Sequence, residues 1–354
     1  MYSPKYTITN KTLKNIGAIE AAREVIENAP LVPSFEKQFK SDAIVRTVHH
    51  GTHIEGNDLT LSQARQVLEG KEIVGKDRDI QEVINYRNVM NLLNELQSKR
   101  GNYDIEMLID IYKETVSNIV SPDKLGIRKS QVVIKEEGSG EVVFNPPSFT
   151  EVSLLLSDFF EWLNSQDARE VHPILRAGIT HYVLVSIHPF VEGNGRTVRA
   201  FASLVLIREG YDIRKFFALE EHFDNDLASY YEAFLKVDKL SDDISQRDLT
   251  SWLEYFTEVV AIELTKIKEK VRNLSIDSRL KLKIGQQVAL TERQMKMVEY
   301  ISEHGSAIMR DLRDVFSMVS EDTILRDIKD LLEKGIMIKQ GSTKGARYII
   351  SRGE

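Results

Sequence analysis

The 354-residue sequence contains no cysteine, which excludes disulfides, catalysis by a thiolate and zinc sites with cysteine ligands. It also lacks the positive charge that would favour nucleic acid or an anionic membrane as a partner of the whole chain, because its formal net charge is −7. With 42% hydrophobic and 29% charged residues, its composition is that of an ordinary globular protein. Any site for an anion must therefore be built locally.

No apolar run is long enough to span a bilayer. The most apolar stretch, residues 177–191, is interrupted by His181 and His188 and is too short for a membrane helix. The first residues lack the basic and then apolar pattern of a signal peptide. We therefore expect a cytoplasmic protein without a membrane partner, and the absence of cysteine fits a reducing compartment.

Most of the chain has the apolar periodicity of amphipathic helices. Apolar residues recur at helical spacing in three segments, 83–96, 107–116 and 152–163. Residues 174–187 are apolar nearly all round, which predicts a buried central helix. The sequence has no internal repeat and no low-complexity tract, so we expect a mainly α-helical fold.

β-Branched residues predict one hairpin among these helices. The runs 131–135 and 141–144 flank the turn residues 138–140, and two prolines at 146 and 147 end the second run. This hairpin could act as a flap over a site in the segment that follows it. A surface hairpin without a role is the alternative.

The C-terminal residues 285–354 have the pattern of a small separate domain. Residues 290–294 open a helix with a capping-box-like start, and two further helical segments follow, the last closed by Gly335. The runs 336–340 and 346–350 then predict a second hairpin. Three helices and a two-stranded wing resemble a winged helix-turn-helix domain.

The segment from His188 to Arg199 contains several side chains that can take part in catalysis or bind an anion. Within twelve residues it places an imidazole, a carboxylate, a glycine-rich turn and two guanidinium groups. His188 follows the apolar helix and precedes a proline, which disfavours helix at its position, and an imidazole at such an exit can accept a proton near neutral pH. This inventory suits phosphoryl or nucleotidyl chemistry.

Gly193, Asn194 and Gly195 form a cradle for phosphate. Glycines let successive backbone N–H groups turn toward an anion, and the helix that begins next points its positive end at the same place. Arg196 and Arg199 are three residues apart on one face near the start of this helix, where cations oppose the helix dipole unless an anion is bound. Their planar groups suit phosphate oxygens.

At every defining position this segment matches the signature of the Fic (Fido) family, which the chain resembles from about residue 42 to residue 240. The resemblance implies transfer of AMP from ATP to a hydroxyl side chain of a target protein. It implies that His188 deprotonates the hydroxyl, that Arg196 holds the β-phosphate region and that Arg199 holds the γ-phosphate. Glu192 could bind Mg²⁺ that bridges the phosphates, and the family has Asp or Glu at this position.

Further parts of the resemblance concern neighbouring contacts. Tyr230 and Tyr231 lie where related proteins carry aromatic residues near the nucleotide base, although an aromatic pair on a helix is as readily part of the core. The family often has Asn four residues after its last arginine, and here that position is Ser203. The target protein is expected to dock near the hairpin at 131–144. Family members often form dimers, so a homodimer is a further expectation.

The chain also resembles Fic proteins that carry an inhibitory helix, expected here at about residues 42–56. In that motif a Ser or Thr is followed by three residues and then by Glu and Gly or Asn, and its glutamate pairs with the second signature arginine. The resemblance therefore predicts that Glu55 pairs with Arg199 and blocks the γ-phosphate position. The hydroxyl position departs from the motif, because Gly51 stands there and Thr52 is one residue late. A surface glutamate at a helix end is the alternative.

These patterns predict a mainly α fold: a Fic-type helical bundle with a small β-hairpin flap, followed by a winged helix-turn-helix domain. We expect an N-terminal helical region in residues 1–100, the Fic catalytic core in 101–260, a charged connecting helix in 261–284 and the winged helix in 285–354. His49, His50 and His53 lie near the inhibitory motif, and we interpret them as incidental rather than as metal ligands.

Other functions stay open. Related proteins use UTP or CDP-choline, or remove the AMP that they attach, and Glu55 could position water for such a removal. A DNA-binding regulator with a nucleotide-sensing Fic domain is the alternative from another class. Arg326 is the best candidate for a groove contact, but acidic residues surround it at Asp322, Asp327 and Asp330, and basic residues after 294 are matched by acidic ones. A protein-binding module is the other interpretation of this domain.

Overall fold

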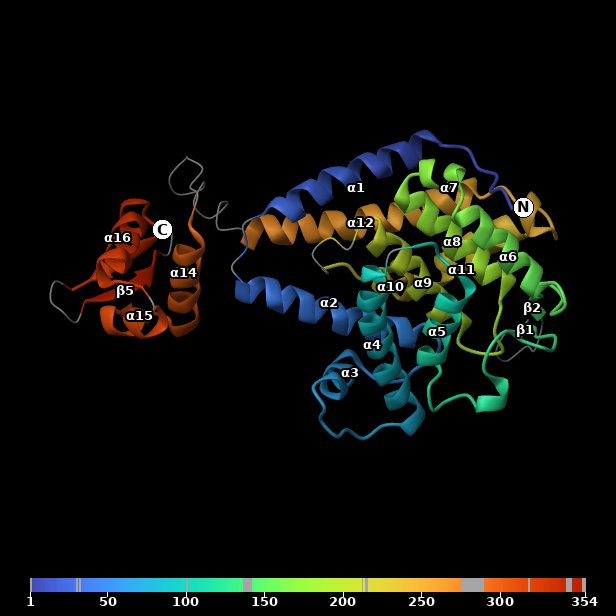
Figure 1. The fold of residues 1–354 in the computed structure, drawn as a ribbon, viewed down its shortest axis with the longest axis horizontal. Helices are drawn as coiled ribbons and strands as arrows, with labels where there is room; N and C mark the ends of the chain where they lie inside the picture. The colour runs from blue at the N-terminus through green and yellow to red at the C-terminus, as the bar shows by residue number, and fades with distance from the viewer. Residues whose placement is uncertain are drawn as a thin grey trace. The chain divides into compact units, whose positions relative to one another are not determined.

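The computed structural model describes residues 2–29, 31, 33–99, 101–135, 142–211, 213, 216–274, 290–317, 319–341 and 346–351. The chain divides into two compact units, Met1–Ala22 with Asp42–Thr265, and Arg23–Ser41 with Lys266–Glu354. Each unit is described separately, and Figure 1 shows the elements of both.

Helices dominate the N-terminal three quarters of the chain. In chain order they are α1 (Asn10–Asn28), α2 (Pro33–His53), α3 (Leu61–Leu68), α4 (Asp77–Ser98), α5 (Ile105–Thr115), α6 (Val152–Leu163), α7 (Gln166–Glu170), α8 (Pro173–Ile187), α9 (Asn194–Arg208), α10 (Glu220–Asn225), α11 (Leu227–Asp238) and α12 (Thr250–Leu274). Short 3₁₀ turns at Pro122–Lys124 and Ile244–Gln246 lie between some of these helices. The prediction of a mainly helical bundle is confirmed.

Helix α8 is the central helix of the first unit. Every residue from Ile174 to Leu184 is buried, as the apolar sequence of this segment predicts. At Gly178 a Cβ atom would lie only 2.9 Å from the Phe256 ring of α12, so the glycine allows the two helices to approach closely. The Trp252 indole N–H donates to the Gly178 carbonyl at 2.7 Å and fixes this contact.

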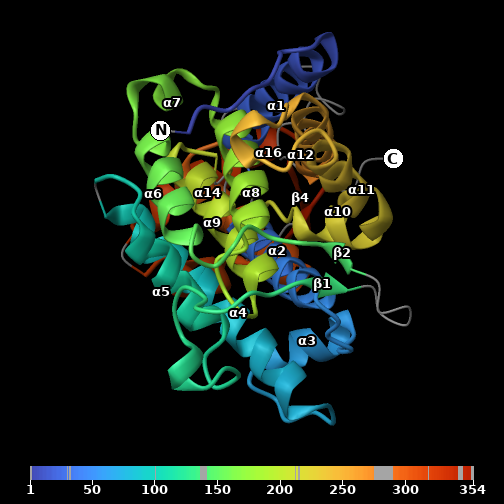
Figure 2. The same ribbon diagram turned by 90° about the vertical axis from the view of Figure 1, so that its right-hand side faces the viewer.

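The two strands of the predicted hairpin are present and pair with each other. β1 (Ile134–Lys135) pairs with β2 (Val142–Phe144) in antiparallel fashion, with Ile134 opposite Phe144 and a register irregularity before Lys135. The turn predicted at 138–140 lies outside the described residues. The Phe144 ring lies 6.2 Å from the His188 ring, which brings this hairpin to the signature segment (Figure 2).

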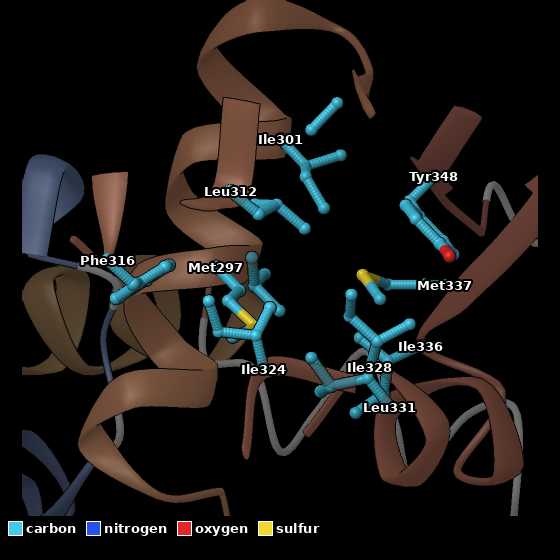
Figure 3. Close-up of a cluster of buried hydrophobic side chains, with 12 residues drawn as sticks. Met297, Ile301, Leu312, Phe316, Ile324, Ile328, Leu331, Ile336, Met337 and Tyr348 are labelled. Atoms are coloured by element: carbon cyan, nitrogen blue, oxygen red, sulfur yellow. The ribbon is translucent and has the colours of Figure 1, made fainter. Parts of the chain in front are cut away.

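The second unit contains the C-terminal domain, and the predicted winged helix is confirmed. Its elements are α14 (Glu292–His304), β3 (Ala307–Ile308), α15 (Met309–Val315), α16 (Glu321–Glu333), β4 (Met337–Gln340) and β5 (Arg347–Ile350). The Thr291 hydroxyl accepts from the Gln294 N–H, and the Gln294 side chain accepts from the Thr291 N–H, so the predicted capping box starts α14. Side chains from all three helices and from the sheet meet in one core (Figure 3).

One expectation on this part of the chain needs correction, the two-stranded sheet. The sheet has three antiparallel strands in the order β3-β5-β4, because the short segment after Gly305 pairs with β5 before α15 begins. The charged connecting helix expected in residues 261–284 is helical as far as Leu274 as the continuation of α12, and residues 275–284 lie outside the described residues. No glycine or proline interrupts residues 250–274, so nothing in the sequence ends that helix earlier.

None of the helices that the structure describes combines the length and the apolar surface that a membrane span requires.

Candidate active site

His188 caps the C-terminal end of α8 in a left-handed conformation, with φ 51° and ψ 62°. This conformation is uncommon for a residue with a side chain and needs support from its surroundings. Arg128 provides it, because its backbone N–H donates to the Pro189 carbonyl at 2.9 Å and its Nε donates to the His188 carbonyl at 2.8 Å. Arg128 is only 2% exposed and also donates to the Pro147 carbonyl at the base of the hairpin.

The environment of His188 favours a neutral imidazole. The pKa of His188 is lowered to about 4, mainly by burial; the Val185 carbonyl and the Glu55 carboxylate oppose this shift only in part, and the Arg128 charge adds to it. At neutral pH the ring is therefore unprotonated and able to accept a proton.

Buried packing and side-chain hydrogen bonds stabilise the signature loop between α8 and α9. The Phe190 ring is fully buried and stacks on Tyr112, with ring centroids 3.8 Å apart. The Phe190 N–H donates to Asn194 Oδ1 at 2.9 Å, and Asn194 Nδ2 donates back to the Phe190 carbonyl at 2.8 Å. The Asn194 side chain is thus occupied within the loop, so any phosphate contact at this position falls to its backbone. Gly193, at φ 77°, precedes α9.

A carboxylate lies on the predicted phosphate cradle. A Cβ atom at Gly195 would meet Glu55 Oε1 at 2.1 Å, so the Glu55 carboxylate covers the first turn of α9. Glu55 Oε1 accepts from Arg199 Nη2 at 2.9 Å, and the Gly51 carbonyl accepts from the same nitrogen at 2.9 Å. Burial opposes the charge of Glu55, but Arg199 and Arg196 outweigh it and hold the pKa of Glu55 below its usual value.

Several buried donors around this carboxylate are unused. Arg196 Nε, Arg196 Nη1 and Arg199 Nε are buried and have no hydrogen-bond partner among the described residues. Buried polar groups are normally hydrogen-bonded, so a cluster of unsatisfied donors indicates a site for an acceptor-rich ligand. Together with the positive end of α9, these donors suit an anion with several oxygens, such as a polyphosphate.

Glu192 is the acidic residue available to a cation. It forms an ion pair with Arg78 of α4 and remains 38% exposed in its side chain. The described residues contain no group of three or more His, Asp or Glu side chains that could hold a metal ion by themselves. A single carboxylate still fits Mg²⁺, which often binds through one or two carboxylates together with substrate phosphates and water.

The two tyrosines differ in environment. Tyr230 is 2% exposed, and its hydroxyl and His181 Nε2 are 2.9 Å apart, so this ring is part of the core. Burial lowers the pKa of His181 to about 3, which leaves its imidazole neutral. Tyr231 is 48% exposed, and both burial and the Glu55 charge raise its pKa. Only Tyr231 therefore offers a ring face near the site to a nucleotide base.

The departure of Gly51 from the inhibitory motif has a steric reason. A Cβ atom at this position would meet the Tyr86 ring at 2.4 Å, and Tyr86 is fixed by donating to Glu220 Oε1 at 3.1 Å. A Ser or Thr does not fit there. The Thr52 hydroxyl donates to the Val48 and His49 carbonyls at 3.0 Å, so it bonds within its own helix.

Other residues of α2 anchor this helix, a role that the sequence analysis did not assign to them. His50 Nδ1 and His53 Nδ1 each lie 2.7 Å from one oxygen of Asp224 in α10. Arg46 Nη1 donates to Glu263 Oε1 of α12 at 3.0 Å. The basic side chains at 46, 50 and 53 recur at helical spacing, which is the signal that could have revealed this face. The histidines at 50 and 53 are therefore not incidental.

Fold and site thus define a helical protein with a glycine-containing loop at a helix N-terminus, unsatisfied arginine donors beside it and an acidic side chain lying on it. The Fic/DOC family model matches residues 102–206, and a model described as DeoR-like helix-turn-helix domain matches residues 293–347. The similarity to the Fic/DOC family thus covers residues 102–206, which include the signature segment.

Curated relatives show the same similarity. The chain is 30% identical over 207 residues to the Protein adenylyltransferase Fic of Drosophila willistoni, covering 58% of this chain and 40% of that protein. It is 30% identical over 201 residues to the protein of the same name from Culex quinquefasciatus, covering 56% and 39%. The chain thus spans about two fifths of the length of these relatives.

Solved structures share the fold. A Fic family protein from Desulfovibrio desulfuricans superposes with a TM-score of 0.67 at 21% identity, over 100% of both chains. A fragment of Fic-1 from C. elegans superposes with a TM-score of 0.60 at 26% identity, over 74% of this chain and 73% of that chain.

Proposed function

We propose that the protein is an adenylyltransferase that moves AMP from ATP to a Ser, Thr or Tyr hydroxyl of a target protein, and that its resting state is autoinhibited. One observation carries this proposal: unsatisfied donors of Arg196 and Arg199 lie beside an anion position that the Glu55 carboxylate covers. The names of the two curated relatives, both called Protein adenylyltransferase Fic, support the same reaction.

The transfer follows from the chemistry of the loop. His188, neutral at physiological pH, accepts the proton of the target hydroxyl as its oxygen attacks the α-phosphorus. The bond from that phosphorus to the bridging oxygen breaks, and pyrophosphate leaves while Arg196, Arg199 and the N-terminus of α9 stabilise its charge. Mg²⁺ bound through Glu192 and the phosphates would neutralise further negative charge.

Glu55 inhibits this reaction by taking the place of a phosphate. Its carboxylate uses the Arg199 donor and lies over Gly195, where a γ-phosphate needs both space and charge. Like charges in one cradle repel each other, so ATP binds weakly or in an unproductive pose while Glu55 remains. Activation therefore requires the end of α2 to move.

The hairpin is the proposed docking place for the target. Val133, Ile134 and Val142 lie on or beside the two paired strands and expose between 39% and 53% of their surface, and apolar side chains grouped on one exposed element suit contact with another protein. An extended segment of a target could pair with such a strand and place its hydroxyl near His188.

The contacts of Asp224 provide a test of the anchoring of α2. We expect Asp224→Asn to raise AMP transfer several-fold, because it removes the charge that holds His50 and His53 while leaving the nucleotide loop intact. Asp226→Asn is the matched control, since Asp226 caps α11 and asparagine is an equally good cap. The rate of protein labelling is measured with ATP labelled on the α-phosphate. Equal rates for the Asp224 variant and the wild type would show that these contacts do not hold the inhibitory helix in place.

Use of another nucleotide, or removal of AMP, is the enzymatic alternative. The phosphate cradle contacts groups that all nucleotides share, and among the candidate base contacts only Tyr231 is exposed. Labelling with UTP or CDP-choline in place of ATP, and release of AMP from a labelled target, distinguish these reactions.

A second candidate function is DNA binding by the C-terminal domain, favoured by the match to a DeoR-like domain. Two of the acidic residues near Arg326 are engaged inside the domain: Asp327 pairs with Arg293, and Asp330 accepts from Lys334 and Gln294 at 2.6 Å. Arg326 and Lys329 are exposed on α16 with Asp322.

For this candidate we expect the full chain to bind duplex DNA with an affinity that falls steeply between 50 and 200 mM salt, because phosphate contacts release counterions. Arg326→Ala should weaken the binding in a fluorescence anisotropy titration, and Lys296→Ala on α14 is the control. No binding at the lower salt concentration would leave the domain as a protein-binding module.

A further inference from the structure

Glu82 of α4 is a second carboxylate beside the signature arginines. It is 5% exposed, and its Oε1 lies 3.1 Å from Arg196 Nη1. Its Oε2 accepts from Asn57 Nδ2 at 3.0 Å, two residues after Glu55 in the chain. Arg78 Nε also donates to Oε1 at 3.3 Å. Glu82 thus connects the segment after the inhibitory helix with the first signature arginine.

The contact of Glu82 with Arg196 differs in geometry from the contact of Glu55 with Arg199. Glu55 accepts a hydrogen bond from Arg199 Nη2 and so uses a donor that a phosphate would need. Glu82 is close enough to Arg196 to balance its charge, but the geometry is not that of a hydrogen bond, and Arg196 Nε and Nη1 remain without an acceptor in the described part of the chain. A buried arginine without any counter-charge would be strongly destabilising. Glu82 therefore compensates the charge of Arg196 and leaves its donors free for a ligand.

Glu82 also belongs to a part of the fold that stays in place. Its neighbour Val83 and the ring of Tyr86, one turn further along α4, are fully buried. Asn57 Nδ2 donates a second hydrogen bond to the Asp79 carbonyl at 2.9 Å, so the end of the segment after Glu55 is tied to the same helix. If the end of α2 moves, Glu55 leaves Arg199, whereas Glu82 stays beside Arg196.

We propose that Glu82 is a positioning residue, which holds the Arg196 guanidinium with its free donors directed at the nucleotide phosphates in the resting and the active state. This inference rests on the proposed function, because it concerns the same phosphate site. The two acidic residues of the site thus have opposite roles. Glu55 occupies a donor of Arg199 that a phosphate would need, whereas Glu82 keeps the donors of Arg196 available to a phosphate.

The test compares Glu55→Gly with the double variant Glu55→Gly/Glu82→Gln. Glutamine keeps an oxygen that can accept from Asn57 but loses the charge that balances Arg196. In the double variant, relative to Glu55→Gly, we expect the Kd for inorganic triphosphate, measured by calorimetry, to rise tenfold or more. The KM for ATP should rise by a similar factor, and kcat should change less. Glu82→Asp in the same background keeps the charge and should recover part of the affinity.

Glu209→Gln in the same Glu55→Gly background is the matched control, because Glu209 pairs with Arg176, another arginine with only 3% exposure, at the far ends of α8 and α9. It should lower the melting temperature without changing the Kd for triphosphate. An unchanged Kd in the Glu82→Gln variant would overturn the proposal and leave Glu82 a structural residue. Should Glu55→Gly bind triphosphate but transfer no AMP, the proposed function fails while the binding comparison still decides the role of Glu82.

Discussion

Replacing Glu55 by glycine is expected to raise the transfer of AMP by about five- to a hundredfold. The carboxylate of Glu55 occupies the first turn of α9 and accepts from Arg199 at 2.9 Å, so its removal frees both the space and the charge that a γ-phosphate requires. Couplings between two sites in proteins are typically about 1–3 kcal/mol, which corresponds to this range of activity. The measurement is the initial rate of protein labelling by ATP that carries the label on its α-phosphate.

Two variants make this result specific. Glu72→Gly removes an exposed acidic residue of the loop after α3 and should leave the rate unchanged. Glu55→Gln keeps the volume of the side chain over Gly195 but removes its charge, so its rate should lie between those of the wild type and Glu55→Gly. A Glu55→Gly rate equal to the wild-type rate would mean that this carboxylate does not restrain the enzyme.

Replacing His188 by alanine in the Glu55→Gly background is expected to lower the rate by about 10²- to 10⁴-fold, the usual contribution of a general base. The Kd for ATP should change little, because His188 is expected to touch the incoming hydroxyl rather than the phosphates. His304→Ala, which removes an exposed histidine of α14, is the control. A small loss of rate in the His188 variant would assign proton removal to another group.

The pH dependence of the rate tests the same role. Burial lowers the pKa of His188 to about 4, so its imidazole is unprotonated at neutral pH and becomes protonated only as the pH falls toward 4. Protonation removes the base, and the rate is therefore expected to be constant from pH 8 to about pH 6 and to fall as the pH approaches 4. A fall centred near the ordinary histidine value of about 6.5 would contradict the buried environment of this ring.

Much of the fold and of the candidate site could be predicted because the residues concerned lie close together in the sequence. The signature runs continuously from His188 to Arg199, and the turn, the helix start and the two arginines all follow from that short segment. The buried helix before it follows from an apolar sequence that can only lie inside the protein. The winged helix follows from a capping box and two β-rich runs.

The residues that the sequence analysis missed act across the fold. Arg128 supports the backbone of His188 from 60 positions away, and no local pattern marks it as different from an ordinary surface arginine. Glu82 lies one residue before the segment 83–96 that we interpreted as an amphipathic helix. Asp79, Glu82 and Tyr86 place polar groups at helical spacing on its buried face, and this was the available signal. The third strand of the wing was missed because its two residues are too few for a β pattern.

The position of Gly51 shows how a departure from a motif is explained only in three dimensions. The sequence leaves the anchoring of the inhibitory helix open, since its hydroxyl is absent. The ring of Tyr86 fills that space, and the contacts of Arg46, His50 and His53 with α10 and α12 anchor the helix instead.

The most direct test of the central claim is a comparison of two labels on ATP. Glu55→Gly is incubated with Mg²⁺ and ATP that carries the label on either the α- or the γ-phosphate, and the protein is then separated from nucleotide under denaturing conditions. Transfer of AMP predicts label on protein from the α-phosphate only, and none when His188 is also replaced. Label from the γ-phosphate, or no label from either position on the enzyme and on added candidate targets, would contradict the account.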